Sequence, residues 1–313
     1  MLALVAFAMA TPVAAAYPER PVTLVVGAAA GGGIDLTARL LAQSLSQALG
    51  QPVVVENRPG AGTRIASEFV AKSPPDGYTL LVTTAAAAID IAMKADAGGN
   101  GARAIAPVST FATTAMLLVV KPSLPVHSVA ALIALAKAKP GTLNYSSSGT
   151  GTIGHLCGEL FRQRTGVDIV HVPYKGAAPS AAALVAGEVD LSFASLPAVL
   201  PFVKAGRVRV LANAGARRSV LLPDVPTMAE GGVSGFDTSL WYGVFAPDGT
   251  PRVVIDRLAR AIAGMAGSAA VAQQLASMGA EVYVNPPEDL AQLVRDETAR
   301  WSGVATAAHA TTD

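Results

Sequence analysis

The chain has 313 residues, of which 51% are hydrophobic, and its formal charge at pH 7 is +1. This length suits one large domain or two ordinary ones. Because the charge is nearly balanced, aromatic residues make up only 5% and no basic run is present, nothing in the composition favours nucleic-acid binding.

The N-terminus resembles a secretory signal peptide. Residues 1–16 are apolar, end in small residues with an Ala-x-Ala pattern and are too few to span a bilayer. The positive residues that usually begin such a signal are missing, so a buried N-terminal helix is the alternative interpretation. We expect cleavage before Tyr17 and a periplasmic location.

From Tyr17 onward, short runs of β-branched residues alternate with helical patterns, as in parallel strands joined by crossover helices. Three strands are predicted in the first half, over residues 22–26, 53–55 and 79–83. Leucines at helical spacing follow the first strand and stop at Gly50, a helix C-cap, so this half is a doubly wound βαβαβ unit. The glycine-rich residues 96–103 predict a loop.

A second α/β set begins after residues 121–125, which resemble an interdomain crossing. Its predicted strands cover residues 143–145, 168–172 and 189–193. A further strand at residues 242–245 leads back toward the first half, and residues 251–308 are mainly helical. The pattern therefore predicts an α/β fold of two lobes.

Three loops lie at the carboxyl ends of predicted strands, where open α/β sheets bind ligands. They cover residues 28–35, which contain Gly31-Gly32-Gly33, residues 146–152, which are rich in hydroxyls, and residues 173–176. A glycine-rich turn from a strand into a helix presents free N–H groups and the positive helix end at one place. We expect an anionic ligand between the lobes.

Nucleotide and metal sites fit this sequence less well. Gly149, Gly151 and Gly154 satisfy the dinucleotide pattern G-x-G-x-x-G, but the acidic residue that should end the next strand is missing, and Asp168 lies at its wrong end. No P-loop lysine follows a glycine loop, and no His, Cys or carboxylate spacing indicates a metal. The lone Cys157 is interpreted as a buried residue. We expect no cofactor and no metal.

Several polar residues near the loops have two interpretations each. Asp35 begins a predicted helix and either caps it or faces the ligand. His155 either binds a ligand carboxylate or is structural, and His171 is interpreted as structural. Lys175 either pairs with an acid or is only solvated, and Trp241 either closes over a ligand or packs at the hinge.

Seven motifs together closely resemble the Bug proteins, the TctC-type extracytoplasmic receptors of tripartite tricarboxylate transporters. The motifs are YPERPV (17–22), GGGID (31–35), VVVENRPGAG (53–62), PDGYTLL (75–81), LNYSS (143–147), VHVPYKG (170–176) and LPDVPT (222–227). They run in register from about Tyr17 to Trp301.

The resemblance implies a type II periplasmic binding protein fold, with two doubly wound α/β lobes and two hinge crossings. Lobe 1 would comprise residues 17–120 and 242–313, and lobe 2 residues 121–241. It also implies a monomer that binds a small organic acid, is not an enzyme, and delivers the solute to the membrane permease subunits of a transporter. The expected ligand-binding residues are Gly32, Gly33, Asp35, Thr83, Ser147, Gly149, Thr150, Thr152, His155, Tyr174, Gly176 and Ser195.

The chain departs from the family pattern in three places. Its first loop, residues 26–31, lacks the family's two prolines and aromatic residue. Residues 85–90 stand where the family often has a Thr-His-x-x-Asn cluster, and residues 85–103 also lack its aromatic and proline pattern. Ala194 and Ser195 stand where the family commonly places Asp, which argues against an amino-acid ligand whose ammonium group needs a carboxylate. These departures leave the identity of the ligand open.

Two other functions compete with transport. A receptor of this kind can report to a signalling partner instead of a permease. A secreted enzyme that acts on a carboxylate would use Asp35 or His155 as its acid–base group, although no second catalytic group stands at a recognisable spacing.

Overall fold

The computed structural model describes residues 17–60, 63–85 and 105–310. The expected signal peptide and the glycine-rich residues 96–103 lie outside this part of the chain. None of the helices described is long and apolar enough to cross a membrane.

The first α/β unit forms as the sequence predicts. Its elements are β1 (Val22–Val26), α1 (Gly33–Leu49), β2 (Val53–Asn57), α2 (Arg64–Ala71) and β3 (Thr79–Thr84). β1 lies between β2 and β3 and pairs with both in parallel. Leucines on one face of α1, such as Leu41 and Leu45, are fully buried, and the helix ends at Gly50 in the left-handed conformation (φ 69°).

A second α/β unit builds the other lobe. Its elements are α4 (Val129–Ala138), β5 (Leu143–Ser147), α5 (Ile153–Thr165), β6 (Ile169–Pro173), α6 (Ala177–Ala186), β7 (Leu191–Ser195), α7 (Leu196–Lys204) and β8 (Arg209–Asn213). β5 pairs in parallel with β6 and β7. The predicted doubly wound arrangement is therefore present in both lobes.

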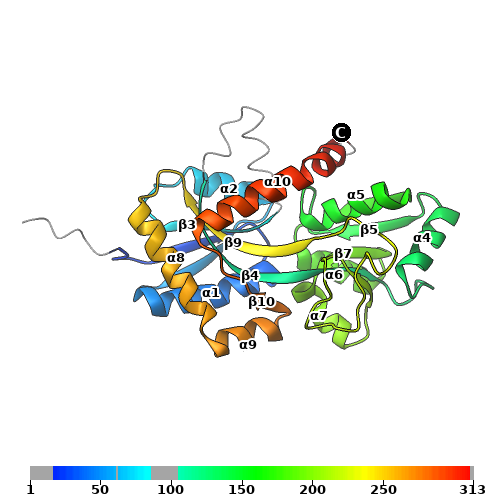
Figure 1. The fold of residues 1–313 in the computed structure, drawn as a ribbon, viewed down its shortest axis with the longest axis horizontal. Coiled ribbons are helices and arrows are strands. Elements are labelled where there is room, and N and C mark those ends of the chain that lie inside the picture. Colours follow the sequence, from blue (N-terminus) through cyan, green and yellow to red (C-terminus); the bar gives the residue numbers. More distant parts are fainter. Residues whose placement is uncertain (1–16, 61–62, 86–104, 311–313) are drawn as a thin grey trace, which may run out of the picture.

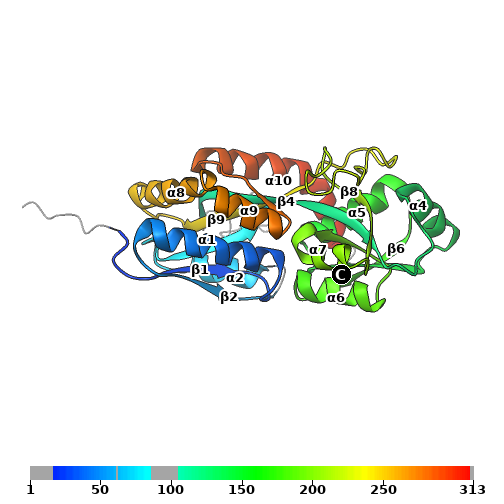
Figure 2. The same cartoon turned by 90° about the horizontal axis from the view of Figure 1, so that it is seen from below.

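Two long strands connect the lobes. β4 (Ile105–Val120) pairs with β9 (Ser239–Pro247) as far as Ala115, and from Met116 on it pairs with β7 and β8. Figures 1 and 2 show β4 passing from one lobe to the other. The strand changes partners between Ala115 and Met116, so the crossing lies earlier than the predicted residues 121–125. The sequence does not reveal this, because the first part of β4 is rich in Thr and Ala and is a weak strand signal that forms a strand by pairing with its neighbours.

The chain returns to the first lobe through β9. The strand order there is β2-β1-β3-β9-β4, so the strand after the return crossing lies inside the first sheet. The C-terminal elements are α8 (Arg252–Ala266), α9 (Ala269–Ser277), β10 (Ala280–Val282) and α10 (Pro287–Ala310). α10 packs on both β4 and α5, so this helix touches both lobes. The two-lobed, type II fold is confirmed.

Candidate functional site

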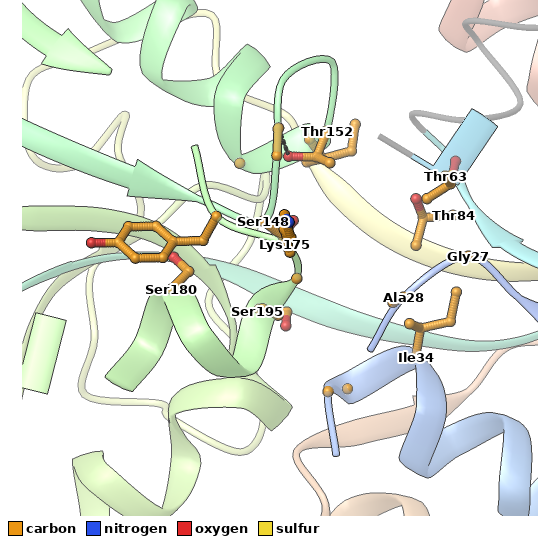
Figure 3. A pocket seen from close by; sticks show the side chains of 18 of the residues that line it. Gly27, Ala28, Ile34, Thr63, Thr84, Ser148, Thr152, Lys175, Ser180 and Ser195 are labelled. Carbon is orange, nitrogen blue, oxygen red and sulfur yellow. Dashed lines mark hydrogen bonds between the residues drawn. The ribbon is translucent and has the colours of Figure 1, made fainter. Parts of the chain in front are cut away.

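A cavity of about 540 Å³ lies between the two lobes. Its walls come from the loops after β1, β2, β5, β6 and β7 and from the crossing strands β4 and β9. Figure 3 shows Ile34 and Thr84 of the first lobe on one side and Ser148 and Ser195 of the second on the other. The three loops chosen from the sequence all contribute to it.

Five helices of the described chain begin at this cavity. The N-cap residues of α1, α2, α5, α6 and α7 all line it, and they are Gly32, Thr63, Thr152, Gly176 and Ser195. None of these five ends is capped by a side chain. The first N–H groups of a helix have no partner inside the helix, and the helix end carries a partial positive charge. The cavity therefore gathers hydrogen-bond donors and positive helix ends from both lobes.

The uncapped Thr and Ser residues at the cavity differ from the serine N-caps elsewhere in the described chain. Where a helix begins elsewhere with a polar residue, as α4 does at Ser128 and α9 at Ser268, the hydroxyl accepts a hydrogen bond from the first turn. At the cavity, the Thr152 hydroxyl instead donates to the Gly149 carbonyl at 2.7 Å. Among the residues described, Thr63 Oγ1 is buried without a hydrogen-bond partner. The helix ends remain available to a ligand.

The charged side chains of the lining that the structure describes are both cations, Arg64 and Lys175. Arg64 lies 3.6 Å from Glu68, an exposed pair that the solvent screens. No Asp, Glu, His or Cys is among the described lining residues. An anionic ligand fits this balance, whereas an ammonium group would find no carboxylate in the described lining, which has Ala194 at the end of β7.

Apolar side chains cover much of the remaining wall. They are Ile34, Met116, Ile153, Phe193 and Leu240, with the ring of Tyr242 beside them. Apolar walls with a few convergent polar groups are typical of small-molecule sites. The arrangement suits a ligand with an aliphatic body and carboxylate ends.

The structure brings eight of the twelve expected ligand-binding residues to the cavity wall. These are Gly32, Gly33, Gly149, Thr150, Thr152, Tyr174, Gly176 and Ser195. The other four, Asp35, Thr83, Ser147 and His155, lie behind the lining and are each buried. Thr83 faces away because successive residues of a strand point to opposite sides, and its neighbour Thr84 lines the cavity.

Asp35 holds the first loop from behind. Its carboxylate accepts hydrogen bonds from Gly31 N–H (2.9 Å), Arg39 Nε (3.0 Å) and Asn57 Nδ2 (2.9 Å). Asn57 Nδ2 also donates to the Ala28 carbonyl. Burial raises the pKa of Asp35, but the hydrogen bonds from Arg39, Gly31 and Asn57 outweigh it and hold the pKa below its usual value. The ionised carboxylate fixes the loop that presents Gly32.

A stack of rings supports the second loop. His171 lies between Tyr145 and His155, with ring centroids 4.8 Å and 4.1 Å away. Ser147 Oγ lies 2.7 Å from His171 Nε2, and His155 Nδ1 accepts a hydrogen bond from Gly151 N–H. Ser147 and His155 therefore shape the loop from behind.

The stack predicts a stability that depends on pH. Burial, and second the neighbouring His155, lower the pKa of His171 to about 3. Below pH 6.5 the His171 side chain is protonated in the unfolded chain and stays neutral in the folded protein. The free energy of unfolding therefore falls as the pH drops, by at most about 1.4 kcal/mol per pH unit. We expect the His171→Gln variant to lose less stability than the parent between pH 6.5 and 5, measured by urea unfolding; equal slopes would contradict this.

The sequence analysis missed several parts of the wall, among them Thr84 at the end of β3 and Met116 on β4. Thr63 and Arg64 follow the turn after β2, and the rule used for the other three loops, that ligands meet strand carboxyl ends, also finds this one. Tyr242 and Leu240 lie on β9, where only the tertiary structure shows which face meets the cleft. Cys157 is buried away from this wall, and burial raises the pKa of its thiol to about 12, as expected of a structural residue.

A two-lobed α/β fold with a cavity between the lobes defines the class of the periplasmic binding proteins. The profile of the family described as "Tripartite tricarboxylate transporter family receptor" matches residues 37–309, and the chain belongs to this family. The resemblance found in the motifs is thereby confirmed.

Individual relatives agree over nearly the whole chain. Protein BugT of Bordetella pertussis is 40% identical over 299 residues, which are 95% of this chain and 92% of BugT. The structure of Rpa4515 of R. palustris with adipate is 42% identical, with a TM-score of 0.87, over 94% of this chain and 98% of the other. MatC from Rhodopseudomonas palustris with bound malate is 32% identical, with a TM-score of 0.86, over 92% and 100%.

Proposed function

We propose that this protein is a periplasmic receptor that captures a small organic acid between its lobes and delivers it to the permease subunits of a tripartite tricarboxylate-type transporter. The observation that carries the proposal is the convergence of five uncapped helix N-termini on one cavity whose charged lining residues are cations. Carboxylates favour such ends because N–H donors and the helix dipole act together.

The ligand would have a carboxylate at each end. Donors come from α1 and α2 of the first lobe and from α5, α6 and α7 of the second, with apolar side chains between them. The related proteins whose structures contain adipate and malate support a dicarboxylate. The direct contacts would come from the eight expected residues that line the wall, while Asp35, Thr83, Ser147 and His155 would act through the loops and strands that carry them.

Capture would proceed by closure of the lobes about β4 and β9. The loop after β1 already meets the start of α6, since a methyl group placed on Gly176 would lie 3.6 Å from Ala29 Cβ. Hinge closure of this kind is the usual transition of periplasmic receptors. The two residues that a carboxylate-processing enzyme would use as its acid–base group, Asp35 and His155, lie behind the described lining of the cavity.

Thermal unfolding with a panel of acids tests the proposal. Adipate and malate are the first probes, and the dimethyl ester of each is its uncharged control. An acid present at 100 times its dissociation constant should add about 2.7 kcal/mol to the free energy of unfolding and raise the melting temperature. No shift with any acid, or equal shifts with the esters, would overturn the proposal.

A further inference from the structure

The helix starts at the cavity have occupied carbonyl groups. The carbonyl oxygens of the N-cap residues Gly32, Thr152 and Gly176 each accept a hydrogen bond from an N–H group four residues further along the chain, at 3.0–3.3 Å. The carbonyl of Thr63, the N-cap of α2, accepts from the Ser67 hydroxyl at 3.2 Å. The backbone acceptors at these helix starts are therefore used within the protein, whereas the first N–H groups of a helix have no partner inside it.

Side chains occupy two further carbonyl groups of the cavity wall. The Ala28 carbonyl, in the loop before α1, accepts from Asn57 Nδ2 at 3.0 Å. The Gly149 carbonyl, in the loop before α5, accepts from the Thr152 hydroxyl at 2.7 Å and from the Ser147 hydroxyl at 3.1 Å. In both loops, therefore, the protein itself uses acceptors that belong to residues of the lining.

The side chains of the wall add donors and few acceptors. The described lining contains no Asp, Glu, Asn, Gln or His, so hydroxyl groups are its only side-chain oxygen acceptors. Its charged side chains, Arg64 and Lys175, can only donate hydrogen bonds. We call this arrangement, in which N–H groups and cations outnumber free acceptors, the donor-rich wall.

A donor-rich wall distinguishes an ionised acid from a protonated one. An ionised carboxylate has acceptors only, whereas a protonated carboxyl group also carries an O–H donor. Inside the cavity such a donor would lose the hydrogen bond that water gave it, which weakens binding by about ten-fold or more. A sulfonate also presents acceptors only and keeps no proton in water. The wall therefore senses whether an acid carries a proton, and not whether carbon or sulfur bears the oxygens.

We propose that this cavity binds organic oxyanions only when they carry no proton, and that organic disulfonates are therefore ligands of it. The inference rests on the proposed function for the site, and extends it to a class of acid that is always ionised. A cavity of about 540 Å³ leaves room for the third oxygen of each sulfonate. The apolar part of the wall, with side chains such as Met116 and Leu240, suits the hydrocarbon spacer of either acid.

Calorimetry with adipate and its disulfonate analogue, in which a sulfonate replaces each carboxylate, tests the inference. At pH 7 the two dianions should bind within about ten-fold of each other. Carboxyl groups like that of Glu have a pKa of about 4.3, so adipate takes up protons between pH 7 and pH 4 and the disulfonate does not. The ratio of the adipate affinity to the disulfonate affinity should fall about ten-fold over this interval. The ratio cancels changes in the protein that affect both ligands equally.

The possible outcomes separate this inference from the proposed function. Adipate binding without disulfonate binding, or a ratio that stays constant between pH 7 and pH 4, would overturn the inference and leave the proposed function intact. Disulfonate binding without binding of any carboxylic acid would overturn the proposed function and leave the inference standing. The uncharged diamide of adipate, which carries N–H donors of its own, should not bind at either pH; binding equal to that of adipate would contradict the donor-rich wall.

The Ala194→Asp variant supplies the acceptor that the described lining lacks. Ala194 lines the cavity near the end of β7. The introduced carboxylate can accept the proton of a half-ionised acid and repels a sulfonate, so the affinity ratio should fall less with pH than in the parent. Ala194→Leu is the matched control, with a side chain of similar size and no oxygen, and should keep the pH dependence of the parent. Equal pH dependence of the ratio in two variants that thermal unfolding shows to be folded would count against the inference.

Discussion

Replacing Gly32 with aspartate is expected to stabilise the protein and abolish acid binding at the same time. Gly32 has φ −78° and ψ 165°, the extended conformation of an N-cap, and its first side-chain carbon would have contacts no closer than 3.7 Å. An aspartate there caps α1 and meets the helix dipole, which together add about 0.5–1 kcal/mol to the free energy of unfolding. The same carboxylate occupies the donors that the ligand needs.

The Gly32→Asn variant separates the two effects. Asparagine caps as well as aspartate but adds no charge, so it should give part of the stabilisation and a smaller loss of affinity. Urea unfolding and calorimetry with adipate measure the two quantities. We expect Gly32→Asp to weaken binding at least about 100-fold, or about 2.7 kcal/mol. A variant that binds adipate like the parent would show that the N-terminus of α1 does not contact the acid.

Replacing Asp35 with alanine is expected to cost about 2–4 kcal/mol of stability and to weaken acid binding. The change leaves the Gly31 N–H without its acceptor and the Asn57 amide without one of its two, and hydrogen bonds to a buried charged group are among the stronger ones. The loop that carries Gly32 then loses its support. Urea unfolding measures the loss, and calorimetry measures the affinity.

The control and the pH dependence follow from the same contacts. Arg39 is half exposed, so Arg39→Ala should lower the free energy of unfolding by less than about 1 kcal/mol.

Because the pKa of Asp35 is lowered on folding, the stability that its carboxylate contributes is complete above the unfolded value of 3.8 and is lost as the pH falls through the lower folded value. The deficit of Asp35→Ala should therefore shrink only at acid pH; equal stability of variant and parent at pH 7 would contradict this role.

The fold could be predicted where local sequence patterns determine single helices and strands. β-branched runs and a C-cap such as Gly50 predict single elements, and the alternation of strands and helices predicts how they join. The first part of β4 has no such signal, because Pro107 and a Thr- and Ala-rich stretch form a strand through pairing with β9 and β10. The crossing was therefore placed too late in the chain.

The candidate site was predictable at the level of loops more than of side chains. Glycine and hydroxyl residues at strand ends must lie at the cleft, because their backbone groups form the helix ends. The direction in which Asp35 or His155 points depends instead on partners far away in the sequence or folded back along the loop, such as Asn57, Gly31 and Gly151. That Tyr242 lines the cavity could be seen only from the tertiary structure, which shows which face of β9 meets the cleft.

Native mass spectrometry of protein purified from the periplasm without refolding tests the central claim most directly. We expect the protein to carry the added mass of one small acid, to lose it on denaturation, and to take up one adipate or malate per chain when the emptied protein is given the acid. Gly32→Asp should carry none. A parent protein that shows only the mass of its polypeptide, and gains none from any acid of the panel, would contradict carboxylate capture between the lobes.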